Sequence, residues 1–229
     1  MTFAALLLSF GISQLVWGPL SDRFGRKPIL LWGMGAYVLA SVACVLAPSM
    51  ALLIAARIAQ GAAMGAAVMG ARAVVRDLYA PLEGAKVMSR GLSGLGVIAI
   101  LCTPLGGLLT DWVHWRAAMA VLAVFGVGTL ALLMLRFQET IPARNPQALA
   151  PRTLWRSWAQ LARHPTFASY CVLSSASYVA LFTFLASSSF MLIQGLGLSK
   201  LAYGGAMAFG SVLYILGTIA CRRLLVRWG

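Results

Sequence analysis

Acidic residues are scarce in this sequence, and charge of either sign is rare. The 229 residues include only 5 Asp and Glu against 18 Lys and Arg, and 61% of residues are hydrophobic. The mean hydropathy is +0.87. A water-soluble domain of this size does not have such a composition. A nucleic-acid-binding protein is also excluded, because it concentrates basic residues on a folded polar face that this chain has too few polar residues to form.

Cysteine is sparse, and its spacing carries no chemical signal. The four cysteines, Cys44, Cys102, Cys171 and Cys221, lie within or beside apolar runs without C-x-x-C spacing. We therefore expect neither disulfides nor a metal site. The sequence also lacks a nucleophile and base pair, a phosphate loop and the strand context of a dinucleotide fingerprint. These absences predict a protein that is not an enzyme and has no cofactor.

Long apolar runs dominate what is present. A stretch of about 20 apolar residues spans the hydrocarbon core as a helix, whereas a membrane-spanning strand needs about 10 residues that alternate in polarity. The runs do not alternate, so the sequence predicts an all-α membrane protein with about seven spans. The expected spans are Thr2 to Leu20, Pro28 to Ala47, Met50 to Val75, Gly91 to Thr110, Ala117 to Leu135, Thr166 to Ile193 and Leu201 to Cys221.

Basic residues are distributed unequally between alternate connections. One set of connections contains only Arg116 and Lys200, whereas the other set contains fourteen basic residues. This asymmetry explains the net charge of +13 better than binding to a polyanionic partner does. The positive-inside rule places the basic set in the cytoplasm, so the N-terminus is expected outside and the C-terminus inside. The basic set is Arg23, Arg26, Lys27, Arg76, Lys86, Arg90, Arg136, Arg144, Arg152, Arg156, Arg163, Arg222, Arg223 and Arg227.

Three motifs carry a family resemblance. The turn from Gly18 to Lys27 has the spacing G-x-L-x-D-R-x-G-R-K, which resembles the loop between the second and third helices of major facilitator superfamily transporters. The segment Arg57-Ile-Ala-Gln-Gly resembles the R-x-x-Q-G motif of the fourth helix. The segment Arg72-Ala-Val-Val-Arg-Asp-Leu resembles that of Bcr/CflA-type drug exporters, which reside in the bacterial inner membrane, and Glu139-Thr140 agrees with the same subfamily.

The resemblance implies a partial major facilitator bundle, with about seven of an expected twelve helices. Residues 1–137 would hold helices 2 to 6, residues 138–165 a cytoplasmic linker, and residues 166–229 the first two helices of the second half. Helix 1 is expected to be missing, because Met1 lies at the edge of an apolar span without a basic lead-in. The segment Leu224 to Gly229 lines up with Leu20 to Gly25, as a duplicated six-helix unit would produce.

The resemblance also implies a conformational latch at the turn. Arg26 is expected to pair with Asp77 and to lock the cytoplasmic side, and Asp22 to contact a helix of the second half. The alternative is that these charges only fix topology. The residues assigned to the latch are Gly18, Asp22, Arg23, Gly25, Arg26, Lys27 and Asp77.

A proton-coupling role is implied for Arg57, Gln60 and Gly61. A base inside a span is costly unless it is paired or hydrated, although Arg57 lies about 10 Å from Met50 and can also snorkel to the interface. All five acids lie at span ends or in connections. Proton antiport needs a buried titratable group, which is therefore expected on helices outside this chain.

Two further sites are expected. Pro104, Gly106 and Gly107 would kink the fourth span, with Thr103 in place of the usual glycine. A cavity lining is expected from Arg72, Tyr178, Phe182 and Phe184, although the hydroxyls of the same span also suit bonds to their own helix. In the linker, the segment Leu154 to Leu161 is amphipathic enough to lie on the membrane, the alternative being a solvated loop.

The expected function is proton-coupled efflux of drugs or small amphipathic metabolites. Two alternatives remain open: a carrier of another solute class such as a sugar or organic acid, and a truncated remnant that does not transport. The expected partners are the lipid bilayer, a small-molecule substrate and protons, together with the missing helices of the same transporter and no nucleic acid.

Overall fold

The chain is helical from end to end in a computed structural model. The structure describes the backbone of residues 2–228, and within it all side chains except those of residues 103–104, 107–108, 110–112, 200–201, 225–226 and 228. No strand occurs in residues 2–228. The elements are α1 (Thr2–Phe24), α2 (Arg26–Leu46), α3 (Met50–Leu78), α4 (Pro81–Trp112), α5 (Trp115–Arg136), α6 (Pro151–Arg163), α7 (Pro165–Ser189), the π-helix η1 (Phe190–Gly195) and α8 (Lys200–Trp228).

Seven of the described helices are long and apolar enough to cross a membrane, which confirms the predicted all-α membrane fold. A helix is the form that satisfies every backbone polar group within a single span. The helices extend past the apolar runs: α3 continues to Leu78, and α4 begins at Pro81, ten residues before the predicted start at Gly91. Hydropathy ends where charged residues begin, but those residues favour helix as well, so the helix continues toward the headgroups.

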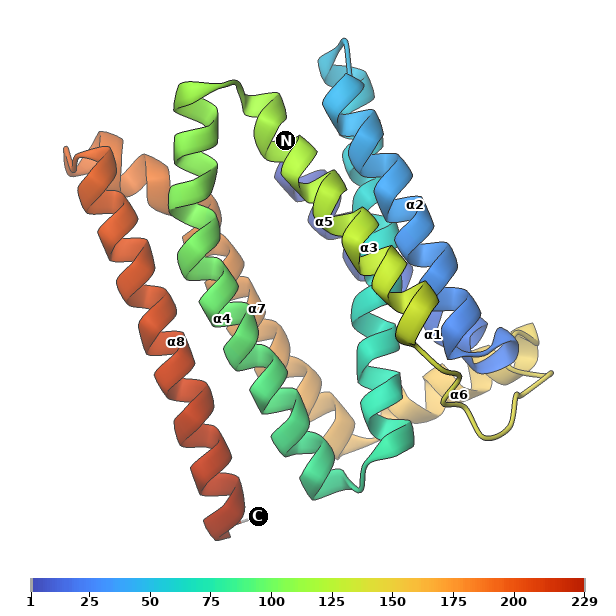
Figure 1. The fold of residues 1–229 in the computed structure, drawn as a ribbon. Coiled ribbons are helices and arrows are strands. Elements are labelled where there is room, and N and C mark those ends of the chain that lie inside the picture. Colours follow the sequence, from blue (N-terminus) through green and yellow to red (C-terminus); the bar gives the residue numbers. More distant parts are fainter. Residues whose placement is uncertain (1, 229) are drawn as a thin grey trace.

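The helices form two groups (Figure 1). In one group α3 packs between α1 and α2, and α5 packs on the far side of α2. The helix α4 leaves this group and packs along α8 instead. The linker helix α6 runs across the ends of the spanning helices rather than along them (Figure 1).

The contact between α1 and α3 depends on small residues. A Cβ atom at Gly61 would collide with the backbone carbonyl of Leu6, and one at Gly65 with the hydroxyl of Ser13. The indole N–H of Trp17 donates a 2.7 Å hydrogen bond to the carbonyl of Ala62 across the same seam. Glycine at these positions lets the two backbones approach closely, as is usual between membrane helices.

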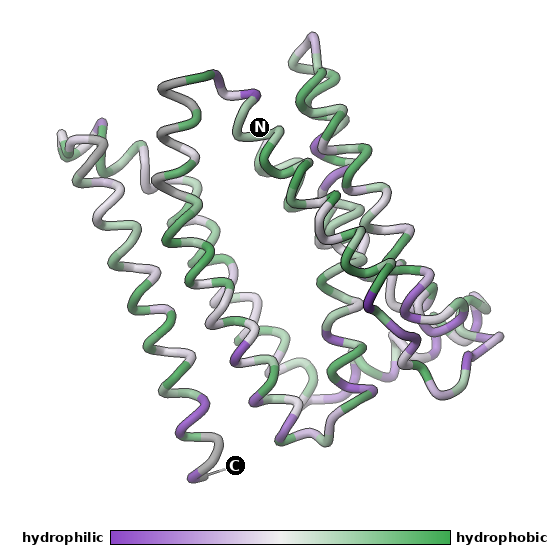
Figure 2. Tube along the Cα trace, viewed as in Figure 1, coloured by the Kyte–Doolittle hydropathy of each residue, from purple (hydrophilic) through white to green (hydrophobic). Residues whose placement is uncertain are grey.

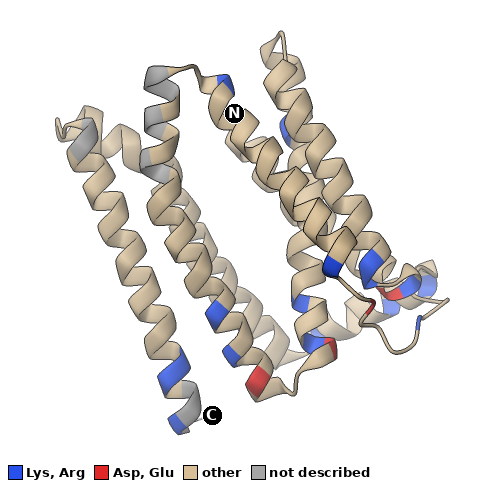
Figure 3. Ribbon diagram, viewed as in Figure 1, with Lys and Arg blue, Asp and Glu red and all other residues tan. Residues whose placement is uncertain are grey.

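Polarity and charge separate along the helices. Hydrophobic residues fill their middles (Figure 2), and most basic residues gather at one end of the bundle (Figure 3). We call this the basic end; it comprises the C-terminal ends of α1, α3, α5 and α8, the N-terminal ends of α2 and α4, and α6.

Candidate functional site

A buried ionic cluster at the basic end is centred on Arg26. Only 2% of this side chain is exposed. Its Nε lies 2.8 Å from Asp77 Oδ2, and its Nη1 lies 2.7 Å from Asp22 Oδ1 and 2.8 Å from Ser21 Oγ. A charge removed from water is tolerated only when paired and hydrogen-bonded, and three acceptors meet that requirement here. The cluster joins the ends of α1, α2 and α3.

The structure thus brings together three of the residues assigned to the latch. Asp22 faces Arg26 from the preceding turn, and among the described residues its carboxylate has no partner on a helix of the second half. Ser21 completes the cluster and was not singled out from the sequence. It is almost fully buried. The sequence could have indicated its role, because it lies one residue before Asp22 in a turn where charged side chains also need neutral donors and acceptors.

Glu139, which follows α5, caps the N-terminus of α2. Its Oε1 accepts from the backbone N–H of Arg26 at 2.9 Å, and its Oε2 from that of Lys27 at 3.2 Å. The N-cap residue of α2 is Gly25, which has no side chain that could do this. A carboxylate at a helix N-terminus satisfies free N–H groups and the helix dipole together.

Four backbone N–H groups converge on the Glu139 carboxylate, since those of Thr140 and Ile141 donate at 3.0 and 3.2 Å. Partial burial raises the pKa of Glu139, but these four donors outweigh it, so the pKa lies below the ordinary value for glutamate. The carboxylate is therefore ionised near neutral pH.

Gly25 makes this approach possible for two reasons. Its φ of 108° is a conformation that residues with a Cβ rarely adopt, and a Cβ there would collide with the Glu139 carboxylate. Nearby, the N–H of Asn145 donates to the carbonyl of Asp22 at 2.9 Å, so the start of the linker folds back over the turn.

The remaining turn residues play separate parts. Gly18 packs beneath Met69, whose terminal carbon lies 3.4 Å from the site of a Cβ. The Arg23 guanidinium lies over the Phe24 ring, 5.4 Å from its centroid. Lys27 donates its backbone N–H to Glu139.

The opposite end of α2 is capped by Arg116, at the start of α5. Its Nε and Nη2 donate to the carbonyls of Val45 and Ala47 at 3.0 and 2.9 Å. A cation therefore lies at the C-terminus of α2 and an anion, Glu139, at its N-terminus, each in the position that the helix dipole favours. Arg116 belongs to the first turn of α5 and Glu139 follows its last turn, so the two ends of α5 supply both charges.

A second buried polar network joins α2 and α3. The Arg57 Nη1 donates to Gln60 Oε1 at 2.9 Å, Gln60 Nε2 donates to Ser41 Oγ at 2.8 Å, and Ser41 donates to the carbonyl of Tyr37 at 2.7 Å. Gln60 and Ser41 are buried. The adjacent Gly61 faces α1 rather than this network. Arg57 is thus hydrogen-bonded inside the bundle, and within the described residues the network includes no carboxylate.

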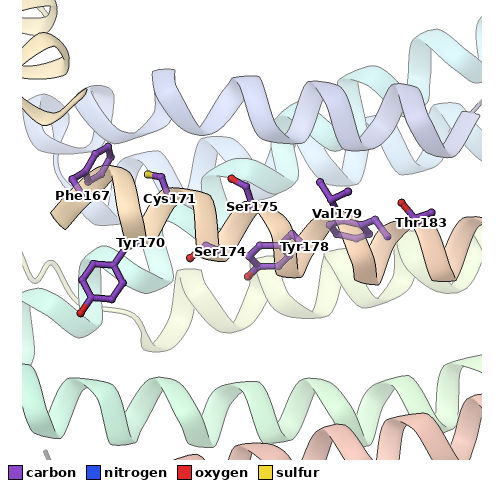
Figure 4. Close-up of a pocket in the computed structure, with 9 residues that line it drawn as sticks. Phe167, Tyr170, Cys171, Ser174, Ser175, Tyr178, Val179 and Thr183 are labelled. Carbon is purple, nitrogen blue, oxygen red and sulfur yellow. The ribbon is translucent and has the colours of Figure 1, made fainter. Parts of the chain in front are cut away.

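One face of α7 is hollowed and lined by aromatic and hydroxyl side chains (Figure 4). The open cavity has a volume of about 710 Å³, and all of its lining residues come from α7. Tyr178 stacks on Phe182 with 6.0 Å between ring centroids, and Phe3 of α1 meets Phe182 edge-on at 6.4 Å. The lining residues are Phe167, Tyr170, Cys171, Ser174, Ser175, Tyr178, Val179, Phe182 and Thr183.

Two residues expected in the cavity lie elsewhere. Phe184 and Arg72 are exposed, and neither belongs to the described lining. Phe184 is six residues from Tyr178, which turns it to another face of α7. Phe3 was not anticipated, because nothing in the sequence indicates which helix α7 meets.

Of the residues predicted to kink the fourth span, only Gly106 is among the described side chains. Pro104 and Gly107 lie outside the described side chains, and Gly106 lies within α4, which the backbone shows as one continuous helix. Among the residues that the structure describes, no group of three His, Cys, Asp or Glu side chains is placed to hold a metal ion.

Comparisons with known proteins agree with this architecture. The chain matches the Major Facilitator Superfamily over residues 1–229. It is 34% identical to multidrug resistance protein D of Escherichia coli K12, covering 93% of this chain and 51% of that protein. It is 29% identical to a chloramphenicol resistance protein of Pseudomonas aeruginosa, covering 100% of this chain and 54% of that protein.

A solved structure shows the same fold. The human organic anion transporter MFSD10 (TETRAN) superposes with a TM-score of 0.71 at 23% identity, over 97% of this chain and 56% of that one. The chain spans about half the length of the curated relatives it matches. Seven helices able to span a membrane and bacterial relatives indicate an integral protein of the inner membrane. These matches confirm the resemblance seen in the motifs, and the chain belongs to the Major Facilitator Superfamily.

Proposed function

We propose that this chain forms part of an exporter that moves drugs or small amphipathic molecules out of the cell by proton antiport. The observation that carries the proposal is the α7 face, where stacked aromatic rings alternate with hydroxyls around an open cavity. Two relatives, named for multidrug and chloramphenicol resistance, support the same substrate class.

The chemistry of the cavity favours amphipathic solutes over sugars or organic acids. Its lining has aromatic and aliphatic surface, five hydroxyl groups in Ser174, Ser175, Thr183 and the two tyrosines, and no charged side chain. Apolar surface with a few polar groups suits a drug-sized molecule. A polyol needs many hydrogen-bond partners and an organic acid needs a cation, neither of which this face offers.

The proposed topology places the basic end in the cytoplasm, with the N-terminus outside. The positive-inside rule supports this orientation, since Arg116 is the one described base in the connections at the other end. In this arrangement residues 138–165 are the cytoplasmic linker between the two halves, and the contact of α4 with α8 joins residues 1–137 to residues 166–229.

The Arg26 cluster serves as the cytoplasmic latch in this proposal. It ties α2 to α3 through Asp77 and to α1 through Asp22, so breaking it would free three helix ends together. Arg57 and Gln60 serve in proton coupling, held in place because Arg57 donates to Gln60 and Gln60 donates to Ser41. The coupling carboxylate lies outside the described network.

Drug binding tests the substrate class. The chain is reconstituted in nanodiscs and titrated with chloramphenicol and with a fluorescent lipophilic cation. Tyr178→Ala should weaken binding about fivefold, the equivalent of one lost aromatic contact. Phe184→Ala is the matched control, since Phe184 is similarly exposed on the same helix but outside the cavity. Equal losses in both variants, or binding of sugars in place of either drug, would contradict the proposal.

Charge reversal tests the latch. Arg26 also contacts Asp22, so a carboxylate at position 26 would meet a second carboxylate, and all variants therefore carry Asp22→Asn. Arg26→Asp and Asp77→Arg should each abolish the drug resistance conferred by the longest reading frame that contains this chain, and together they should restore part of it. Failure of the double reversal to restore any resistance, with all variants present in the membrane at equal amounts, rules the pair out as a latch.

A further inference from the structure

The linker helix α6 separates its side chains by polarity more sharply than any spanning helix. At 100° per residue, Leu154, Trp155, Trp158, Leu161 and Ala162 fall within one arc of about 120°. Arg152, Arg156 and Arg163 are spaced by four and seven residues and fall on a stripe about 40° wide on the other side.

The described chain leaves most of the apolar arc uncovered. Trp155 is 73% exposed, Leu161 is 47% exposed and Trp158 is 43% exposed. The helix has no fully buried residue, and its principal helix neighbour is α7, which follows it in sequence. Two tryptophans and a leucine facing water would be costly, at about 25 cal/mol for each Å² of apolar surface. An apolar environment must therefore meet this face.

The position of α6 identifies that environment. Only His164 separates its last residue from Pro165, the first residue of the spanning helix α7. The helix lies across the basic end, where the spans terminate (Figure 3). Its 13 residues therefore lie at the depth where the hydrocarbon gives way to the headgroups.

Charge identifies the lipid. The sequence has no Asp or Glu after Glu139, and none of the three α6 arginines forms an ion pair with the residues that the structure describes. The surrounding basic end adds more positive charge (Figure 3). A second copy of this chain would bring a second arginine stripe and repel the first, whereas an anionic headgroup pairs with it.

We propose that α6 lies in the plane of the membrane and binds anionic phospholipid. Trp155, Trp158 and Leu161 insert at the boundary of the acyl chains, and Arg152, Arg156 and Arg163 bind the headgroup phosphates. The partner is thus a lipid such as phosphatidylglycerol in the leaflet next to the basic end. This inference stands on α6 alone and is independent of what the protein transports.

Site-directed spin labelling in nanodiscs tests the depth of the helix. In a chain whose native cysteines are replaced by alanine, labels are placed at Ala162→Cys within the apolar arc and at Gln160→Cys on the opposite face. Both residues are exposed, and both substitutions leave the tryptophans and arginines in place. The label at 162 should collide with oxygen and be protected from a water-soluble nickel chelate, and the label at 160 should behave in the opposite way.

Two results would overturn the placement. Equal access of the chelate to both labels would put α6 in water. Protection of residue 162 from oxygen and chelate alike would mean that protein, rather than lipid, covers the apolar arc.

Hydrogen exchange of the α6 amides tests the lipid class. In the unlabelled chain, protection should rise when phosphatidylglycerol is added to phosphatidylcholine nanodiscs. Replacing Arg152, Arg156 and Arg163 by Gln should lower that protection by about fivefold for each arginine. The control replaces Arg222, Arg223 and Arg227 by Gln, which removes the same charge from the basic end elsewhere. Protection that does not depend on phosphatidylglycerol, or equal losses in the two triple variants, would overturn the assignment to anionic lipid.

Discussion

At the scale of single residues, the charged groups of the basic end are stabilised by backbone as much as by each other. Arg26 has two carboxylates and a hydroxyl, whereas Glu139 has four backbone N–H groups and no basic side chain among its bonded partners. The two sites are adjacent, because the N–H that Glu139 accepts belongs to Arg26 itself. A change at Gly25 or Glu139 should therefore disturb the whole cluster.

Gly25→Ala should lower the free energy of unfolding by about 1–3 kcal/mol, because the new residue is held at positive φ and its Cβ displaces the Glu139 carboxylate. Denaturant unfolding in detergent micelles measures this. Gly35→Ala in the middle of α2 is the control, since a Cβ there meets no heavy atom of the described residues within 4 Å. An equal effect at both positions would count against a special role for Gly25.

Glu139→Gln should make the chain less stable at neutral pH, and the difference from the wild type should shrink in acid. Because the pKa of Glu139 is lowered on folding, its ionised form contributes stability above its unfolded pKa of about 4.3. That contribution is lost as the pH falls from there through the folded pKa. Thermal unfolding at pH 7 and at pH 3 measures the difference, and a difference that is the same at both values would show that the charge is not involved.

At the scale of elements, α2 is the helix on which both α3 and α5 pack. It packs between α3 and α5, and its ends are capped by Arg116, in the first turn of α5, and by Glu139, which follows α5. The seam between α1 and α3 works differently, since small residues rather than charges set the distance between those two helices. Close packing of this kind tolerates even one added methyl group poorly.

Gly61→Ala should therefore separate α1 from α3 and lower the free energy of unfolding by about 1–3 kcal/mol. The new methyl group collides with the carbonyl of Leu6 and the hydroxyl of Ser9. Gly11→Ala on α1 is the matched control, because a Cβ there meets no heavy atom of the described residues within 4 Å. Unfolding by denaturant compares the two, and a loss at Gly11 as large as that at Gly61 would refute the packing explanation.

At the scale of the whole molecule, the crossing of α4 to α8 connects the two groups of helices. The hydroxyl of Ser89 donates to the carbonyl of Thr218 at 2.9 Å, and the hydroxyls of Ser93 and Thr218 lie 2.7 Å apart. A Cβ at Gly96 would meet Ile215 at 2.6 Å. These contacts make the α4 and α8 interface close and specific.

Ser93→Cys with Thr218→Cys should form a disulfide readily under mild oxidation, because the two replaced hydroxyls are in direct contact. The native cysteines are replaced by alanine, and mass spectrometry of linked peptides measures the yield. Ser93→Cys with Ser211→Cys is the control, since position 211 lies about 10 Å from position 218 along the axis of α8. A similar yield from both pairs would show that α4 and α8 are not held in this register.

Much of the fold was predictable from the sequence, for physical reasons that act locally. A run such as Pro28 to Ala47 is apolar over the length that a bilayer requires, so its helix and its membrane location follow from composition alone. The motif around Arg26 and Asp77 led to a pairing hypothesis, and the structure places their side chains 2.8 Å apart. The capping of α2 by Glu139 and Arg116 was not predictable, because neither residue shows in the sequence which helix end it faces.

The sequence by itself determined the spanning helices, the charge asymmetry of their connections and the family, since each of these depends on residues close together along the chain. Only the tertiary structure decided that α4 packs on α8, that Phe3 meets Phe182, and that Glu139 and Arg116 cap one helix. Within lipid, an apolar helix gains little by choosing one apolar neighbour over another, so helix partners are selected by the fit of small residues and a few polar contacts. That fit depends on three-dimensional geometry, which hydropathy does not encode.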